Sequence, residues 1–96
     1  MIYFVACIYM DKNREVERYE EYIREVKPIV ERFGGRYLAR SEKITALSEK
    51  WKPDRVILIE WDSREQLERC FSSEEYRSIA GKRENTVDSR AMIVEG

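Results

Sequence analysis

The sequence IYFVACIY at residues 2–9 is the stretch that decides the fold. It has the length of one β-strand, and alternate residues of a strand point to opposite faces of the sheet. The sets that belong to the two faces are Ile2, Phe4, Ala6, Ile8 and Tyr3, Val5, Cys7, Tyr9. A strand with one face in water alternates apolar with polar residues, but here both sets are apolar. We therefore expect this strand to be covered on both faces.

A helix is predicted to follow, because apolar residues recur every three or four positions over about five turns. These residues are Val16, Tyr19, Ile23, Val26, Val30 and Phe33. Pro28 is expected to kink the helix or restart it. One glycine of the pair Gly34-Gly35 is expected to take a left-handed conformation that ends the helix.

A second helical segment is predicted from its capping residues. The sequence SREQ at residues 63–66 is a capping box that places a helix start at Ser63. The sequence SSEE at residues 72–75 can cap another helical piece.

Further strands are predicted at residues 36–40, 55–61 and 88–95, with a strand or hairpin extension at residues 43–48. The order is therefore βαββαβ, and right-handed crossovers place both helical segments on one face of a four-stranded antiparallel sheet. This is the ferredoxin-like α+β fold, expected as one domain over residues 1–96.

The second face of this sheet needs a cover of its own. The strands at residues 55–61 and 88–95 are also apolar on both faces, yet two helical segments cover one face only. The simplest cover is the same face of a second copy, stacked about a twofold axis. We expect a homodimer.

The composition argues against several classes of function. In 96 residues, 18 Lys and Arg stand against 19 Asp and Glu, so no basic surplus is available to hold nucleic acid. No apolar run approaches the roughly 20 residues that cross a bilayer, and we expect no membrane partner. The opening segment has no basic leader, so a strand is favoured over a signal peptide. Cys7 and Cys70 are expected to be buried thiols of a cytoplasmic protein.

The sequence contains no histidine. Histidine is the base that activates serine and cysteine nucleophiles, and it is a ligand in most catalytic zinc sites. The acidic residues of the first helix are interleaved with basic ones and show no metal-ligand grouping. We therefore expect neither a metal nor a cofactor.

The βαββαβ order is shared with RNA-recognition domains, which carry exposed aromatic residues on their two central strands. The sequence RVILIEW at residues 55–61 has aliphatic residues at those positions. Together with the net charge of −1, this argues against RNA binding.

Several blocks of sequence are recognisable over nearly the whole chain. They are FGGRYLAR at 33–40, WKPDRV at 51–56, EWDS at 60–63, SEEY at 73–76, Arg83, DSR at 88–90 and VEG at 94–96. In order and spacing they resemble an uncharacterised bacterial and archaeal family, domain of unknown function 1330. The resemblance implies the dimeric α+β barrel superfamily, in agreement with the expected homodimer, and it implies no activity.

The polar and aromatic residues of these blocks are the candidates for a ligand site. They are Arg40, Trp51, Arg55, Tyr76, Arg83, Asp88 and Ser89. Arginine beside tyrosine or tryptophan can hold a small carboxylate or a planar ring. Glu60 joins them, because a buried carboxylate in a mostly apolar strand can act as a base. An edge position or an arginine partner explains Glu60 as well.

The alternative is that these residues only hold the fold together. Arg83 and Asp88 are five residues apart and can form an ion pair that fixes the approach to the last strand. We favour this structural role for Arg83. Trp51 and Tyr76 can likewise serve packing alone.

Two functions from different classes follow from these alternatives. In the first, a cavity between sheet and helices binds a small organic molecule and can also carry out cofactor-independent chemistry on it. In the second, the protein is a non-catalytic structural or interaction dimer with no small-molecule site. A polar-lined cavity of several hundred Å³ favours the first, and a filled core favours the second.

Overall fold

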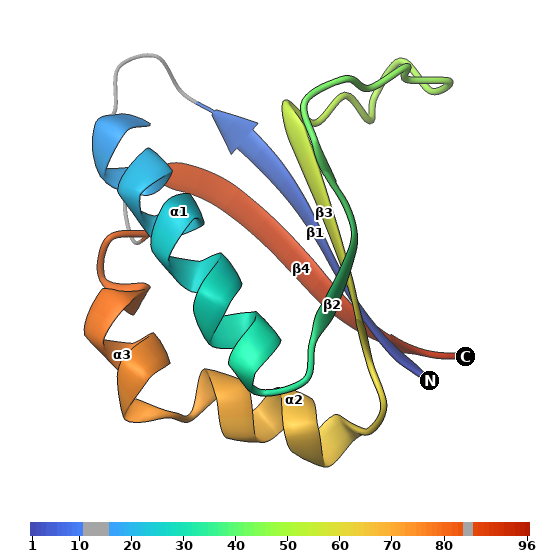
Figure 1. The fold of residues 1–96 in the computed structure, drawn as a ribbon. Coiled ribbons are helices and arrows are strands. Elements are labelled where there is room, and N and C mark those ends of the chain that lie inside the picture. The colour runs from blue at the N-terminus through green and yellow to red at the C-terminus, as the bar shows by residue number, and fades with distance from the viewer. Residues whose placement is uncertain (11–15, 84–85) are drawn as a thin grey trace.

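The computed structural model describes residues 1–10, 16–83 and 86–96. Four strands form one antiparallel sheet in the order β2-β3-β1-β4, and the described helices all lie on one of its faces (Figure 1). The elements along the chain are β1 (Ile2–Met10), α1 (Val16–Arg32), β2 (Arg36–Ser41), β3 (Arg55–Trp61), α2 (Arg64–Phe71), α3 (Glu74–Ala80) and β4 (Val87–Glu95). This sheet order confirms the predicted ferredoxin-like α+β fold.

The core lies between the helices and the helix-facing side of the sheet. The predicted stripe of α1 supplies Tyr19, Ile23 and Val30, all of them buried. From β3, Ile59 and Trp61 point toward the same core. In the register of β1 with β3, Phe4 lies opposite Ile59, so both side chains point to the helix-facing side of the sheet.

The end of α1 follows the prediction for the glycine pair. Gly34 has a φ of 95°, the left-handed conformation that favours glycine. Gly35 is required for a different reason, because a Cβ there would lie 2.5 Å from Val30 Cγ1 and 3.0 Å from the ring of Trp61. α1 itself continues through Pro28 without restarting.

The second helical segment consists of two helices, each with the serine cap that the sequence predicts. Ser63 accepts a hydrogen bond from the backbone N–H of Gln66 (3.3 Å) at the start of α2. Ser73 accepts one from the backbone N–H of Tyr76 (3.2 Å) at the start of α3.

The strand predicted at residues 43–48 is wrong. β2 ends at Ser41, which pairs with Val56 near the beginning of β3, so no residues of β3 remain opposite 43–48. The connection between β2 and β3 instead projects beyond the sheet as a loop (Figure 1).

The face of the sheet opposite the helices is rich in apolar side chains. The register of β1 with its two neighbours places on this face Tyr3, Val5, Cys7, Val56, Leu58, Met92 and Val94. Met92 is 57% exposed and Val94 is 42% exposed. We call this set of side chains the open face. The helices of the described residues leave it uncovered, as the sequence predicts.

Candidate functional site

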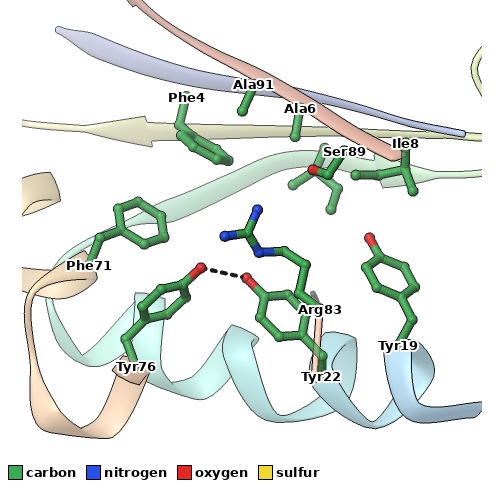
Figure 2. Close-up of a pocket in the computed structure, with 11 residues that line it drawn as sticks. Phe4, Ala6, Ile8, Tyr19, Tyr22, Phe71, Tyr76, Arg83, Ser89 and Ala91 are labelled. Carbon is green, nitrogen blue, oxygen red and sulfur yellow. Dashed lines mark hydrogen bonds between the residues drawn. The ribbon is translucent and has the colours of Figure 1, made fainter. Parts of the chain in front are cut away.

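A cavity of about 320 Å³ lies between the sheet and the helices (Figure 2). Most of its walls are aromatic or aliphatic, and a few polar groups converge on it. The lining residues are Phe4, Ala6, Ile8, Tyr19, Tyr22, Ile57, Phe71, Tyr76, Arg83, Ser89 and Ala91.

Two small side chains keep the space open. Ala6 of β1 lies directly opposite Ala91 of β4, and both face the helices. Larger residues at these two positions would fill the gap between the sheet and the tyrosines of the helices. Ala91 stays exposed although it faces the helices, so the cavity opens along β4, the edge strand.

A pair of buried tyrosines forms the wall opposite the sheet. The hydroxyl oxygens of Tyr22 on α1 and Tyr76 on α3 are 2.9 Å apart and share a hydrogen bond. The ring of Phe71 packs edge-on against Tyr76, with 4.8 Å between the ring centroids. Burial raises the pKa of Tyr22 well above its ordinary value, so this hydroxyl stays neutral.

Arg83 supplies the one positive charge among the described lining residues. Its guanidinium points into the cavity between the tyrosine pair and the sheet (Figure 2). Its Nε is buried and has no hydrogen-bond partner among the described residues. A buried donor without a partner is uncommon in native proteins and calls for an explanation.

The backbone around Arg83 is held in place by the turn that follows α3. The N–H of Arg83 donates to the carbonyl of Ala80 (3.1 Å), and the carbonyl of Arg83 accepts from Thr86 Oγ1 (2.6 Å). The neighbouring Lys82 reaches α1, where its Nζ lies 2.6 Å from Glu25 Oε1. The turn therefore fixes where the Arg83 side chain begins.

The predicted Arg83–Asp88 ion pair is wrong. Asp88 pairs instead with Arg90, whose Nη2 lies 3.0 Å from Asp88 Oδ2. The reason is the alternation of β4, in which Ser89 faces the cavity while Asp88 and Arg90 face the other side of the sheet. Arg83 and Asp88 thus lie on opposite faces.

Arg55 and Arg40 have structural partners outside this cavity. Arg55 is 8% exposed and bonds to Glu20 (3.1 Å) and Glu42. Burial disfavours the charge on Arg55, but the two carboxylates more than compensate and its pKa lies above the ordinary value. Arg40 donates to the carbonyl of Ile23 (3.0 Å).

Glu60 and Trp51 also lie away from the cavity. Glu60 lies opposite Tyr3, on the same side of the sheet as the open face. Arg36 Nη2 lies 2.9 Å from its carboxylate, so an arginine partner accounts for Glu60. Trp51 is 58% exposed in the loop between β2 and β3. Of the predicted site residues, the cavity therefore brings together Tyr76, Arg83 and Ser89.

Tyr19 and Tyr22 are lining residues that the sequence did not mark as site candidates. Tyr19 falls in the apolar stripe predicted for the first helix, and Tyr22, three positions later, lies outside that stripe. The signal that could have marked them is the hydroxyl group, because a buried tyrosine usually needs a hydrogen-bond partner.

The described residues contain no cluster of three or more His, Cys, Asp or Glu side chains that could hold a metal ion. Cys7 and Cys70 are both free and buried, and burial raises the pKa of the Cys70 thiol to about 11. Among residues 1–10, 16–83 and 86–96, no helix is long and apolar enough to span a membrane.

The sheet order and the helices on one face define a ferredoxin-like α+β protein. The chain belongs to the family described as Domain of unknown function (DUF1330), whose family model matches residues 2–96. No match was found among curated protein sequences.

Solved structures share the fold at low sequence identity. A protein of unknown function from Rhodopseudomonas palustris is 21% identical, with a TM-score of 0.81 over 99% of this chain and 81% of that one. A putative antibiotic biosynthesis monooxygenase from Nitrosomonas europaea is 13% identical, with a TM-score of 0.71 over 100% and 98%. SnoaB, a cofactor-independent oxygenase from Streptomyces nogalater, is 10% identical, with a TM-score of 0.69 over 99% and 91%. At these identities the likeness establishes the fold alone.

Proposed function

We propose that this protein is a cytoplasmic homodimer that binds a small organic molecule in the cavity between its sheet and its helices. The observation that carries the proposal is the buried Nε of Arg83, which faces a cavity of about 320 Å³ without a hydrogen-bond partner among the described residues. Pockets for small molecules typically begin at about 300 Å³ and combine apolar walls with a few convergent polar groups.

The alternative of a purely structural dimer accounts less well for this arrangement. Arg55 also has one buried nitrogen, Nη1, without a partner among the described residues, but its Nη2 bonds both Glu20 and Glu42. The Arg83 side chain, in contrast, makes no hydrogen bond to a described residue, although a residue that only supports the fold is expected to have its buried polar atoms satisfied. A ligand in the cavity would supply the partner that Arg83 lacks.

The homodimer is supported by the open face. Leu58 and Val56 on β3, with Met92 and Val94 on β4, form a contiguous apolar surface around Val5 at the centre of the sheet. Stacking this face on its twofold copy would remove it from water and bury about 1,200 Å² of total surface or more. The exposed apolar side chains of Met92 and Val94 favour this arrangement over a monomer.

The lining residues favour binding over acid–base catalysis. Histidine is absent from the sequence, and the described lining contains no carboxylate. Burial raises the pKa of Tyr19 and of Tyr22, so neither hydroxyl exchanges a proton easily near neutral pH. Cofactor-independent chemistry would therefore depend on the reactivity of the ligand itself.

A thermal-shift screen against a metabolite library tests the proposal, because a ligand that binds only the folded protein raises its melting temperature. We expect Ala91→Phe, which fills the mouth of the cavity, to abolish the shift given by each hit. The matched control Ala91→Ser adds a single oxygen atom and should keep the shift. Hits whose shift is the same in the Ala91→Phe protein would show that they bind elsewhere and would refute the proposal.

A further inference from the structure

We infer that the ligand of this cavity is a small monoanion, a carboxylate carried on a planar ring, whose acidic group is held by Arg83 and the Tyr22–Tyr76 pair. The inference rests on the proposed function and names the chemical class of the molecule that the cavity takes.

The first argument is a count of hydrogen-bond donors. Arg83 Nε lacks an acceptor among the described residues. Tyr22 and Tyr76 together have two hydroxyl protons, and the bond between them uses one. The second proton has no acceptor among the described hydrogen bonds. The cavity therefore has two unused donors, Arg83 Nε and one hydroxyl of the tyrosine pair. A ligand group that complements both donors needs more than one acceptor atom.

The second argument is charge. The guanidinium of Arg83 is always protonated, and no carboxylate is present among the described residues that line the cavity. Among the described acidic side chains, Glu25 is paired with Lys82, and Asp88 is paired with Arg90 on the other face of the sheet. A cation facing apolar walls is unfavourable without a counter-charge, so the ligand is expected to bring a negative one.

The third argument decides between a carboxylate and a phosphate. Arginine makes two-point contacts with both carboxylates and phosphates, so the difference lies in charge. A phosphate group carries more negative charge and is typically held by further cations or by backbone N–H groups. Arg83 is the one lysine or arginine among the described lining residues. Its single charge fits a monoanion.

The shape of the walls indicates the rest of the molecule. The rings of Phe4 and Phe71 lie 5.2 Å apart between their centroids, and that of Phe71 packs on Tyr76. Such rings favour stacking or edge contacts with a planar ligand. A cavity of roughly 150 Å³ can hold a benzene molecule. The volume of about 320 Å³ thus has room for one substituted ring.

NMR titration with benzoate, benzamide and phenyl phosphate tests the inference on the unaltered protein. Benzoate and benzamide have nearly the same shape and differ in charge. We expect benzoate to bind at least about ten times more tightly than benzamide, because only benzoate brings a negative charge and two equivalent acceptor oxygens to the guanidinium of Arg83. Phenyl phosphate should bind more weakly than benzoate.

The Arg83→Gln variant locates the effect. It should weaken benzoate binding by about 10- to 100-fold and change benzamide binding far less. The matched control is Arg69→Gln, which makes the same change at an exposed position on α2 and should alter neither affinity. Tyr76→Phe removes one hydroxyl from the pair and should weaken benzoate binding more than benzamide binding, because a hydrogen bond to a carboxylate is stronger than one to a neutral carbonyl.

The outcomes separate this inference from the proposed function. Equal binding of benzoate and benzamide, tighter binding of phenyl phosphate, or failure of all three probes to bind would overturn the inference. A neutral library compound that is blocked by Ala91→Phe but keeps its full affinity in the Arg83→Gln protein would also overturn it, and would leave the proposed function standing. Library hits whose thermal shift is unchanged by Ala91→Phe would instead refute the proposed function.

Discussion

The Arg83→Met substitution should make the unliganded protein more stable. Methionine has a similar length but no donor, so it removes the unsatisfied Nε from the wall of the cavity and leaves an apolar side chain there. Asp88 is unaffected, because its partner is Arg90 on the other face of the sheet. An Arg83–Asp88 ion pair would have predicted the opposite, a loss of stability when Asp88 lost its partner.

The expected gain follows from the environment of Arg83. A buried donor without a partner costs about 1–3 kcal/mol. The residue as a whole is only partly buried, so the lower end of this range applies. A gain of about 1 kcal/mol in the free energy of unfolding corresponds to a melting temperature about 4–8 °C higher for a domain of this size.

Thermal unfolding followed by circular dichroism, at one fixed protein concentration and without ligand, measures this change. The matched control is Arg69→Met on the exposed side of α2, which should change the free energy of unfolding by less than about 0.5 kcal/mol. A fall in the melting temperature of the Arg83→Met protein beyond that of the control would mean that Arg83 supports the fold, and would refute the reasoning.

Three further predictions concern the fold and the assembly. Gly34→Ala should lower the free energy of unfolding by about 1 kcal/mol in urea denaturation, because the φ of 95° at this position is strained for alanine; no loss would contradict the left-handed assignment. The pKa of Tyr22 is raised by burial from its ordinary 10.0, so the unfolded state loses this proton first. Stability should therefore fall as pH rises above 10, and less steeply in the Tyr22→Phe protein; equal slopes would argue against this assignment. Light scattering should give the mass of two chains at micromolar concentration and of one chain for Leu58→Glu on the open face; one chain mass for the unaltered protein would exclude the dimer.

The sequence alone predicts the fold because the signals that set it are local. The apolar run at residues 2–9, the glycine pair at 34–35 and the serines at 63 and 73 each specify the backbone from neighbours only a few positions away. The prediction of a strand at 43–48 is wrong because strand formation depends on a distant part of the chain. A strand needs a partner, and the register of Ser41 with Val56 leaves none there.

The site depends on contacts between distant parts of the chain. Tyr22 and Tyr76 are 54 residues apart in sequence, and nothing in the sequence near either one indicates that their hydroxyls meet. Tyr76, Arg83 and Ser89 could be named as candidates from their types, but the sequence did not separate them from Arg40 or Glu60.

The sequence by itself determined the order of elements, the helix ends and the apolar character of both faces of the sheet, because propensity and periodicity act over a few residues. Only the tertiary structure decided which polar residues form a site. The register of β1 and β4 sets Ala6 beside Ala91 and so opens the cavity, and it turns Ser89 toward Arg83 and Asp88 away from it. Shifting that register by one residue would exchange the two faces of the strand, and no local pattern in the sequence specifies it.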